Sequence, residues 1–195
     1  VCAGGVSTEH TRVLAALDSV PRVGFLPPEL RALAGVDRPL PIGYGATNSQ
    51  PWTVRFMLEL LAVPAGGKLL DVGSGSGWTT ALLAHLTGPE GSVLGVDIVP
   101  ELVAWGGENL RSTGLFWARI ELAVGRLGAP ESGPFDRILV SADAGRIPAE
   151  LEAQLASGGR MVLPAAGEMW VVDRDDKGFR RVAVPGHHFS FVPLV

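Results

Sequence analysis

The sequence holds little of the residue chemistry that builds disulfide bonds or metal sites. Its single cysteine, Cys2, cannot form an internal disulfide, and none of its four histidines is spaced from Cys2 as zinc ligands are. The adjacent pair His187 and His188 is more typical of a protein surface than of a metal site. We therefore predict a protein without a bound metal ion.

Long apolar runs and clusters of basic residues are also missing. No segment approaches the ~20 apolar residues that cross a bilayer, and the N-terminus lacks the basic and apolar stretches of a secretory signal. The 16 Lys and Arg residues against 20 Asp and Glu residues give a net charge of −4, which argues against nucleic acid or an anionic membrane as a partner. We expect a soluble, cytoplasmic protein that binds a small ligand or a peptide.

The chain does contain enough apolar material for one core. Its 195 residues are 47% hydrophobic and 18% charged, which excludes disorder as the main state. Its glycines and prolines are spread along the chain and do not gather in a linker. We therefore expect a single domain over residues 1–195, in which residues 1–65 form a helical and loop extension that covers the active site.

This N-terminal extension is predicted as two helices joined by a loop. Residues 7–20 begin with Ser and Thr as capping residues and continue with apolar residues at helical spacing. Residues 38–50 are rich in Gly, Pro, Asn and Ser, which predicts a polar loop of the kind that often carries function. Pro51 suits the first turn of a second helix with a broad apolar face.

Beyond residue 66, short β-rich runs alternate with helical segments. This alternation is typical of a parallel sheet covered on both faces. The last three runs have little helical material between them, so we expect an antiparallel edge. The fold class predicted is doubly wound α/β, Rossmann-like, with a mostly parallel seven-stranded sheet. The candidate strands are 68–72, 92–96, 119–124, 135–141, 160–163, 169–173, 180–184 and 189–195, and the candidate helices are 78–86, 101–110 and 148–155.

A glycine-rich loop over residues 71–77 follows the first of these candidate strands. An α/β sheet binds its ligand at this position, at the carboxyl end of a strand. A dinucleotide fingerprint requires a further glycine at the position of Trp78. Asp71 comes two residues before the first glycine, and its carboxylate disfavours a pyrophosphate and favours a ligand that carries an ammonium or sulfonium group.

A second acid ends the next candidate strand. Asp97 lies 20 residues after Gly77, where an acidic side chain can accept hydrogen bonds from both hydroxyls of a ribose. S-adenosyl-L-methionine combines a ribose with ammonium and sulfonium charges and has no phosphate, so we predict it as the cofactor. The alternative is that Asp71 caps a turn and that Asp97 caps the helix starting near Pro100.

Several further motifs resemble those of one known family. They are Pro21-Arg22, Phe25-Leu26-Pro27, Pro41-Ile42-Gly43, Gly45 to Pro51, Asp71 to Gly77, Gly133 to Asp136, Ile147-Pro148, Gln154-Leu155, Gly158 to Arg160, Pro164 and Phe191 to Leu194. Together they cover nearly the whole chain and resemble the protein-L-isoaspartate (D-aspartate) O-methyltransferase family. The resemblance implies an S-adenosylmethionine-dependent carboxyl O-methyltransferase acting on isoaspartyl residues of peptides or proteins, whose methyl ester product cyclises to a succinimide.

The resemblance also implies roles for single residues. Ser49 is the hydroxyl beside the transferred methyl group, and it orients the substrate carboxylate. Thr47, Asn48 and Ser190 lie at the peptide site. The residues implied to hold the cofactor are Asp71, Gly73, Ser74, Gly75, Gly77, Trp78, Asp97, Ile98 and Gly125. The alternative for Ser49 is a helix N-cap before Pro51.

Three departures from the family pattern leave other functions open. Residues 124–128 lack the Gly-Asp-Gly that holds adenine in the family, Asn48 replaces a branched apolar residue, and Ser190 replaces a basic one. These changes favour, as an alternative, a biosynthetic enzyme that methylates a normal aspartate of a modified precursor peptide to form an aspartimide. A non-catalytic binding protein and an NAD-dependent enzyme are further alternatives.

Overall fold

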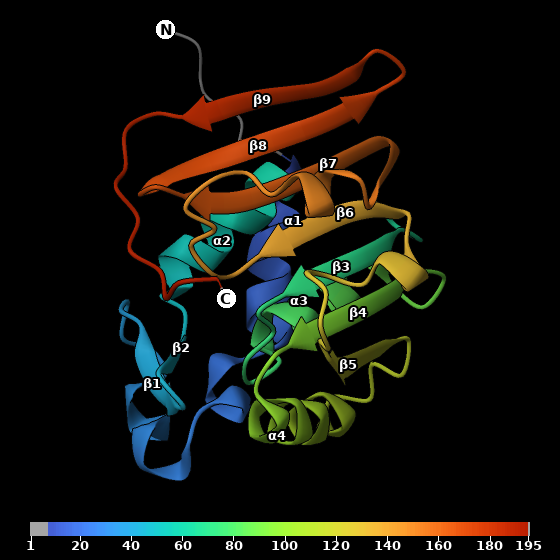
Figure 1. The fold of residues 1–195 in the computed structure, drawn as a ribbon. Coiled ribbons are helices and arrows are strands. Elements are labelled where there is room, and N and C mark those ends of the chain that lie inside the picture. Colours follow the sequence, from blue (N-terminus) through green and yellow to red (C-terminus); the bar gives the residue numbers. More distant parts are fainter. Residues whose placement is uncertain (1–7, 195) are drawn as a thin grey trace, which may run out of the picture.

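The central sheet of the computed structural model positions the loops that bind ligands. The structure describes residues 8–194, so the prediction for Cys2 lies outside the described residues. Within this range, seven strands form one sheet in the order β5-β4-β3-β6-β7-β8-β9 (Figure 1). The strands are β3 (Lys68–Val72), β4 (Ser92–Asp97), β5 (Ala118–Leu122), β6 (Phe135–Val140), β7 (Leu155–Ala165), β8 (Glu168–Asp175) and β9 (Gly178–Val184).

The sheet is parallel from β5 to β7 and antiparallel at β8 and β9. This arrangement confirms the predicted mixed sheet with an antiparallel C-terminal edge. The chain runs from β3 to β4 on one side and later returns to β6 on the other side of β3. Such a reversal of strand order creates a crevice at the carboxyl ends of the two central strands, where ligands of α/β proteins bind.

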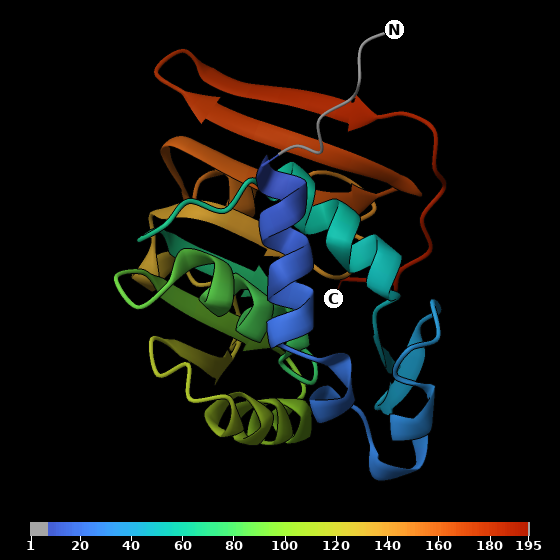
Figure 2. The ribbon, with the colours of Figure 1, turned by 180° about the vertical axis from the view of Figure 1, so that it is seen from behind.

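Helices cover the two faces of the sheet unequally. Helices α1, α2 and α3 lie on one face, and α4 lies beside β4 and β5 at the β5 end of the sheet (Figure 2). The opposite face carries only the short α5, the turn η3 and loops (Figure 1). The bounds are α1 (Thr8–Ser19), η1 (Arg22–Phe25), η2 (Pro28–Leu33), α2 (Pro51–Leu61), α3 (Trp78–Thr87), α4 (Pro100–Ser112), η3 (Pro130–Ser132) and α5 (Ala149–Glu152).

Each face of the sheet has its own apolar core because side chains alternate along a strand. In β3, Leu69 packs among the helices α1, α2 and α3, whereas Leu70 and Val72 pack on the other side with Phe135 and Leu151. Leu69, Leu70 and Val72 are all buried. Burial on both faces explains why these strands read as continuous apolar runs in the sequence.

The predicted loop over residues 38–50 is wrong in one respect, because most of it forms a β-hairpin. Strands β1 (Leu40–Gly43) and β2 (Ala46–Asn48) pair antiparallel. The turn between them has positive φ at Tyr44 and Gly45, 55° and 75°. Positive φ at both central residues matches the twist of a tight hairpin, and two apolar residues of β1 are buried. Buried and exposed residues alternate along β1, but the many turn-forming residues around them obscured this pattern in the sequence.

The last candidate strand, over residues 189–195, is also wrong. The segment over residues 187–194, which we call the C-terminal strap, runs without regular structure beside the loop after β6. Its one β-bridge within the described residues joins Pro193 to Asp143, whose N–H donates to the Val192 carbonyl at 2.8 Å. The strap therefore obtains its backbone hydrogen bonds from a loop and not from the sheet edge.

Two further bounds differ from those predicted. The helix expected over 148–155 shortens to α5, and the strand expected over 160–163 extends to Leu155–Ala165 as β7. The sequence Gly158-Gly159 is typical of a loop, but it lies inside β7 at an irregularity in the pairing with β6. Glycines inside a strand often mark such bulges.

Hydrogen bonds join α1 and the residue after it to α3 and to the segment after α2. Arg12 donates to the carbonyls of Val63 and Leu86, at 3.0 and 3.2 Å. The Trp78 indole N–H donates to the Val20 carbonyl at 3.0 Å. Residues of α1 and α2 also share the core on the helical face of the sheet. The single domain over residues 1–195 stays a prediction.

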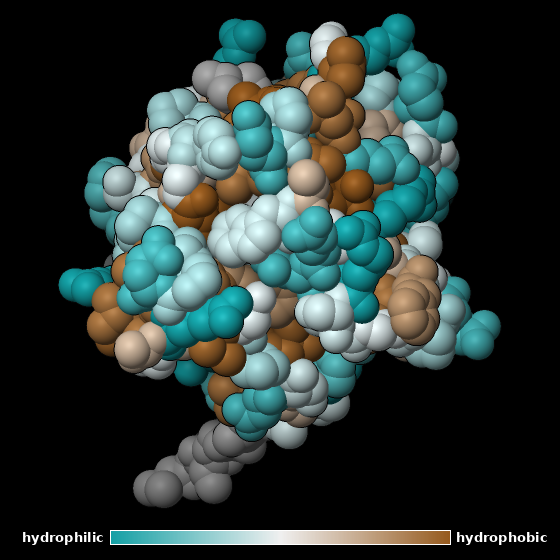
Figure 3. Space-filling view, turned by 90° about the horizontal axis from the view of Figure 1, so that it is seen from below, coloured by the Kyte–Doolittle hydropathy of each residue, from teal (hydrophilic) through white to brown (hydrophobic). Residues whose placement is uncertain are grey.

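Apolar and hydrophilic side chains are mixed on the face of the molecule that is seen from below. Figure 3 presents apolar residues as small areas separated by hydrophilic side chains. The free edge of β9 carries Arg180 and Arg181, which form ion pairs with Asp173 and Glu152 at 2.7 and 2.6 Å. Within residues 8–194, no helix combines the length and apolarity needed to cross a membrane. The cytoplasmic location stays a prediction.

Candidate active site

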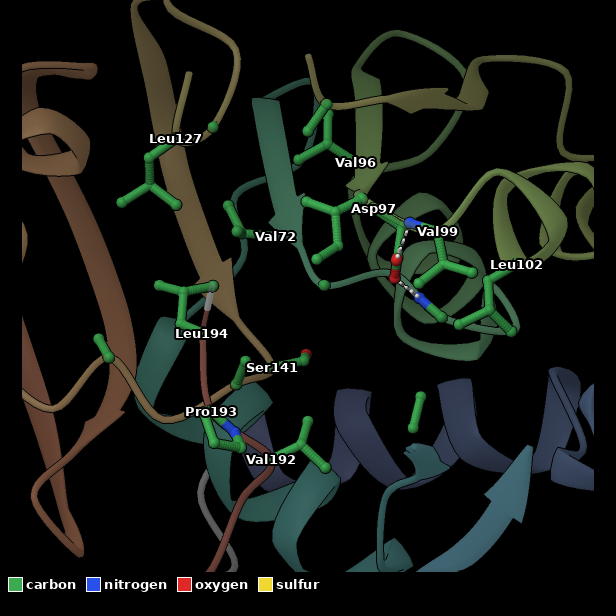
Figure 4. A pocket seen from close by; sticks show the side chains of 18 of the residues that line it. Val72, Val96, Asp97, Val99, Leu102, Leu127, Ser141, Val192, Pro193 and Leu194 are labelled. Atoms are coloured by element: carbon green, nitrogen blue, oxygen red, sulfur yellow. Dashed lines mark hydrogen bonds between the residues drawn. The ribbon is translucent and has the colours of Figure 1, made fainter. Parts of the chain in front are cut away.

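A cavity of about 670 Å³ opens at the carboxyl ends of the central strands (Figure 4). Its size falls within the range of small-molecule sites. The hairpin tip, the glycine loop, the loops after β4, β5 and β6, and the C-terminal strap all contribute to its wall. Segments far apart in the sequence thus meet at the point where the strand order reverses.

The glycine loop contributes two of its three glycines to this wall. Gly73 and Gly75 line the cavity and have positive φ of 78° and 51°, a backbone conformation that L side chains rarely adopt. Gly77 does not line it and instead begins α3, with a φ of 89°. A Cβ atom at Gly77 would lie 2.9 Å from the carbonyl oxygen of Gly106 in α4. Close packing against α4 is thus one reason for a glycine here, and the cofactor contact of Gly77 stays a prediction.

Asp97 ends β4 at the cavity wall and is 8% exposed. Its Oδ2 accepts a hydrogen bond from the Gly75 N–H at 2.8 Å, and its Oδ1 accepts one from the Val99 N–H at 3.0 Å (Figure 4). The carboxylate thus holds both the glycine loop and the entry to α4. Each oxygen keeps a further lone pair for a ligand, and the ribose contact stays a prediction. The alternative that Asp97 caps α4 is wrong, because the N-cap of α4 is Val99, with no side-chain capping hydrogen bond.

Asp71 lies beneath the glycine loop and is fully buried. Its Oδ2 accepts hydrogen bonds from the hydroxyls of Thr79 and Thr80, both at 2.7 Å. Burial raises the pKa of Asp71 to about 6, although these two hydrogen bonds oppose the rise. Asp71 lines neither cavity, and its contact with the cofactor stays a prediction.

The predicted catalytic hydroxyl lies behind the main cavity wall. Ser49 lines a second, smaller cavity of about 30 Å³, which shares Thr47, Gly73, Gly75 and Ser141 with the larger one. The N-cap of α2 is Gln50, which makes no side-chain capping hydrogen bond. The capping alternative for Ser49 is therefore wrong. Thr47 reaches both cavities, as a residue at the peptide site should.

Asn48 does not line the larger cavity, and its peptide contact stays a prediction. Its side chain is buried between Arg22 and Ser76, and it borders only the smaller cavity. The cause is the alternation of β2, which turns Asn48 away from the face that Thr47 presents. The predicted peptide contact of Ser190 is also not supported, because Ser190 is exposed and outside both cavities.

The remaining predicted cofactor residues divide between the two cavities. Ile98, which is 50% exposed, and Gly125 line the larger cavity. Ser74 and Trp78 border the smaller one, and the Trp78 ring packs into the core. Residues 124–128 therefore reach the cavity wall although they lack the family's acid.

Sequence reasoning missed several lining residues. They include Tyr44, Leu127, Ser141 and Arg146, together with the strap residues Val192, Pro193 and Leu194. The strap carried a signal, because its last residues belong to a motif that resembles the family. The others carried no local signal, since only the fold brings their loops to the cavity.

The residues present fit S-adenosyl-L-methionine. Asp97 offers acceptors for ribose hydroxyls, and the open glycine backbone leaves room for close approach. Val96, Ile98 and Leu102 supply an apolar wall. Two buried oxygens beneath the loop, Asp71 Oδ1 and Ser74 Oγ, have no hydrogen-bond partner within the described residues. Buried acceptors with spare capacity next to a cavity suit a ligand with positive charge.

Fold and site together define the class of S-adenosylmethionine-dependent methyltransferases. The structure resembles a Plasmodium falciparum protein described as a protein-L-isoaspartate O-methyltransferase and solved in complex with S-adenosyl-L-homocysteine, with a TM-score of 0.81 over 94% of this chain and 90% of that one at 23% identity. It also resembles a second protein-L-isoaspartate O-methyltransferase, with a TM-score of 0.84 over 98% of this chain and 62% of that one at 22% identity. These likenesses confirm the predicted fold.

The sequence comparisons identify the family. The protein-L-isoaspartate(D-aspartate) O-methyltransferase family matches residues 4–195. A protein-L-isoaspartate O-methyltransferase of Anaeromyxobacter dehalogenans (strain 2CP-C) is 49% identical over 162 residues, which are 83% of this chain and 76% of that protein. One of Methanopyrus kandleri is 42% identical over 189 residues, 94% of this chain and 83% of that protein. The chain belongs to the protein-L-isoaspartate(D-aspartate) O-methyltransferase family, as its motifs predicted.

Proposed function

We propose that the protein transfers the methyl group of S-adenosyl-L-methionine to the free carboxylate of isoaspartyl residues in peptides and proteins. The observation that carries this proposal is the family match over residues 4–195, joined to a cavity whose wall combines the glycine loop with the hairpin. The cofactor supplies an electrophilic methyl group on sulfur. A carboxylate oxygen of the substrate bonds to this carbon while the carbon–sulfur bond breaks and its electron pair stays on sulfur.

This reaction requires no general base in the protein. A carboxyl group of this type has a pKa near ~4 and is ionised at neutral pH, so no proton has to be removed before attack. The contribution of the chain is to hold the two reactants in line, and such positioning can supply roughly 7–11 kcal/mol. The absence of His, Cys and Lys side chains from the wall of the larger cavity, within the described residues, agrees with this requirement.

Different parts of the wall hold the two reactants. Asp97, Gly73 and Gly75 would hold the ribose and the amino-acid part of the cofactor, while Ile98 and Gly125 would border its adenine. Thr47 and Ser49 approach from the hairpin side and would hold the substrate carboxylate by hydrogen bonds. Val192, Pro193 and Leu194 of the strap also line the larger cavity and would limit the access of water to it (Figure 4).

The alternative of a precursor-peptide aspartate methyltransferase receives no support from the site. It depended on Asn48 and Ser190 as altered peptide contacts, and neither residue lines the larger cavity. The third departure, in residues 124–128, lies on the wall near Asp97 and concerns the cofactor and not the peptide. We therefore retain isoaspartyl peptides as the substrate class.

A transfer assay with labelled methyl donor tests the proposal. Three peptides of one sequence would carry isoaspartate, normal aspartate or asparagine at one position, and the asparagine peptide serves as the control without a carboxylate. We expect transfer to the isoaspartyl peptide alone. Transfer to the normal aspartyl peptide alone would support the biosynthetic alternative, and donor binding without any transfer would indicate a binding protein.

A further inference from the structure

Within the N-terminal extension, a buried guanidinium joins η1 to the hairpin. Arg22 in η1 is 5% exposed. Its Nε donates to Asn48 Oδ1 at 2.7 Å, and its Nη2 donates to the carbonyls of Asn48 and Arg38, both at 2.9 Å. Its Nη1 donates to the Val36 carbonyl at 3.0 Å. One side chain therefore fixes three backbone segments at once.

The amide of Asn48 extends this link to the glycine loop. Its Nδ2 donates to Ser76 Oγ at 3.0 Å, and Ser76 is itself buried. The Ser76 carbonyl accepts a hydrogen bond from Asn109 of α4, also at 3.0 Å. The Arg22 guanidinium lies 5.6 Å from the centre of the Trp78 ring. Arg22, Asn48 and Ser76, which we call the buried clamp, thus join the extension to the loop that lines the cavity.

The buried clamp places a charged side chain in the interior, which lowers the stability of the fold. Burial lowers the pKa of Arg22 to about 10, with Asp37 opposing the fall, so the side chain remains a cation at neutral pH. Its hydrogen-bond partners within the described residues are neutral carbonyl and amide oxygens. A buried charge without an ionic partner costs stability compared with apolar packing. The clamp fixes the relative positions of the segments that it joins.

Thr47 and Ser49 are the two chain neighbours of Asn48. Because the three residues are consecutive, the backbone of Asn48 fixes where both neighbours stand, and Asn48 borders the same small cavity as they do. Both border the smaller cavity together with Gly73 and Gly75. The position of Asn48 relative to Ser76 therefore sets the position of both hydroxyls relative to the glycine loop.

We propose that Arg22 and Asn48 are positioning residues that fix Thr47 and Ser49 against the glycine loop through the Asn48–Ser76 hydrogen bond. The inference rests on the proposed function, because it assigns the hairpin to the substrate and the glycine loop to the methyl donor. In-line transfer of the methyl group depends on how the hairpin and the glycine loop are placed relative to each other. A misplacement of about 1 Å can lower the rate of such a reaction by ~10²-fold.

Two substitutions break the link at its two ends. Ser76→Ala removes only the hydroxyl that accepts from Asn48, and Asn48→Leu removes both side-chain hydrogen bonds at similar volume. We expect each to lower kcat on an isoaspartyl peptide by about 10-fold or more, within the range that misplacement can cause. The dissociation constant of the methyl donor should stay within about threefold of the wild-type value, because Asp97 and the loop glycines are unchanged.

A rescue variant and a matched control separate positioning from general damage. In Asn48→Asp, one carboxylate oxygen accepts a hydrogen bond from Arg22, and the other accepts a hydrogen bond from the Ser76 hydroxyl. This variant should recover most of kcat. Ser112→Ala removes a serine hydroxyl that donates to the Asn109 carbonyl at 2.6 Å, on α4 and outside both cavities. It should leave kcat unchanged.

The kcat of the wild-type protein on the isoaspartyl peptide is the reference for all variants. If Ser76→Ala and Asn48→Leu both keep this kcat, or if Asn48→Asp is as slow as Asn48→Leu, the clamp has no positioning role. If the wild-type protein itself transfers no methyl group, the proposed function fails instead. Amide hydrogen exchange then tests the clamp without activity: exchange at residues 47–49 should be faster in Ser76→Ala than in Ser112→Ala, and equal rates overturn the proposal.

Discussion

At the scale of single residues, the site divides into side chains that face the cavity and side chains that hold the loops behind it. Thr47 and Asp97 belong to the first group, and Asp71 and Asn48 to the second. The division matters because the first group should change binding or turnover directly. The second group should act through stability, through charge or through the placement of a neighbour.

Ser49→Ala tests the hydroxyl assigned to the substrate carboxylate. We expect kcat on an isoaspartyl peptide to fall by about 10–10³-fold, the scale of removing one positioned polar group. Affinity for the methyl donor should be spared, since Ser49 borders only the smaller cavity. Steady-state kinetics with donor titration measures both quantities. Unchanged turnover would remove Ser49 from the mechanism.

Asp97→Ala should produce the opposite pattern. The carboxylate lines the cavity and also holds the Gly75 N–H. Hydrogen bonds to a charged group contribute ~1.5–3 kcal/mol, so donor affinity should fall by roughly 10- to 100-fold. Isothermal titration calorimetry with the methyl donor measures this loss. An affinity equal to that of the wild type would mean that the ribose is held elsewhere.

The buried carboxyl group of Asp71 predicts a pH dependence of stability. Its pKa of about 6 lies above the value near ~3.9 expected in the unfolded chain. Between these values the folded protein binds more protons, so this group makes the free energy of unfolding fall as pH rises from about 4 to about 6. Asp71→Asn removes this contribution.

Urea denaturation of wild type and Asp71→Asn at pH 4 and pH 7 measures the effect. The stability of the variant relative to wild type should increase by roughly 2–3 kcal/mol between these two pH values, from the size of the pKa shift. Other carboxyl groups titrate in both proteins and cancel in the difference. A difference that is the same at both pH values would contradict the raised pKa.

How far single residues could be predicted depended on whether their signal was local. Asp97 and the loop glycines stand at fixed distances from strand ends, so the sequence indicated them. The Arg22–Asn48 contact joins residues 26 positions apart in a buried hydrogen bond, and no short-range pattern announces it. The close approach of Gly77 to Gly106 of α4 could not be predicted either, because the sequence does not distinguish a glycine that approaches a ligand from one that approaches a helix.

At the scale of elements, the strap is fastened by a cluster of aromatic rings. Phe189 of the strap stacks on Phe56 of α2 with ring centres 5.7 Å apart, and Phe56 stacks on Trp52 at 5.2 Å. The His187 ring meets Trp52 edge-on at 4.8 Å. Asp143 holds the other end of the strap by backbone hydrogen bonds. The segment is therefore fixed on both sides of the cavity wall without being a strand.

Phe189→Ala tests this attachment. Because Phe189 is buried, we expect the free energy of unfolding to fall by about 3–5 kcal/mol, and KM for the peptide to rise as the strap loosens. Urea denaturation and steady-state kinetics measure the two effects. The exposed neighbour provides the control, since Ser190→Ala should change stability by less than ~0.5 kcal/mol. Equal stability of the two variants would show that the rings do not hold the strap.

The sequence predicted most elements well, and its errors share a physical cause. Helices and parallel strands have a periodic apolar pattern and clear ends, which explains the close match for α2, α3 and β3. The hairpin and the strap lack a long pattern of this kind. Their conformation depends on contacts with the rest of the fold, which a short window of sequence does not contain.

At the scale of the whole molecule, the N-terminal extension and the sheet are proposed to fold as one unit. Arg160 of β7 donates to the Leu60 carbonyl of α2 at 3.0 Å, and α1 shares its core with α3. Differential scanning calorimetry should therefore show a single transition whose calorimetric and van't Hoff enthalpies agree. Two separate transitions would mean that the extension is an independent domain.

The arginine pair on β9 has a consequence for molecules that meet in a crowded solution. The outer strand of an open sheet is a template on which a foreign strand can grow. Arg180 and Arg181 place positive charge on β9, beside the acids Asp173 and Glu152 of the same chain, and charged side chains on an edge strand disfavour pairing with a foreign strand. We therefore expect concentrated solutions of the protein not to form fibres through this edge. Replacing both arginines by valine should increase aggregation through it.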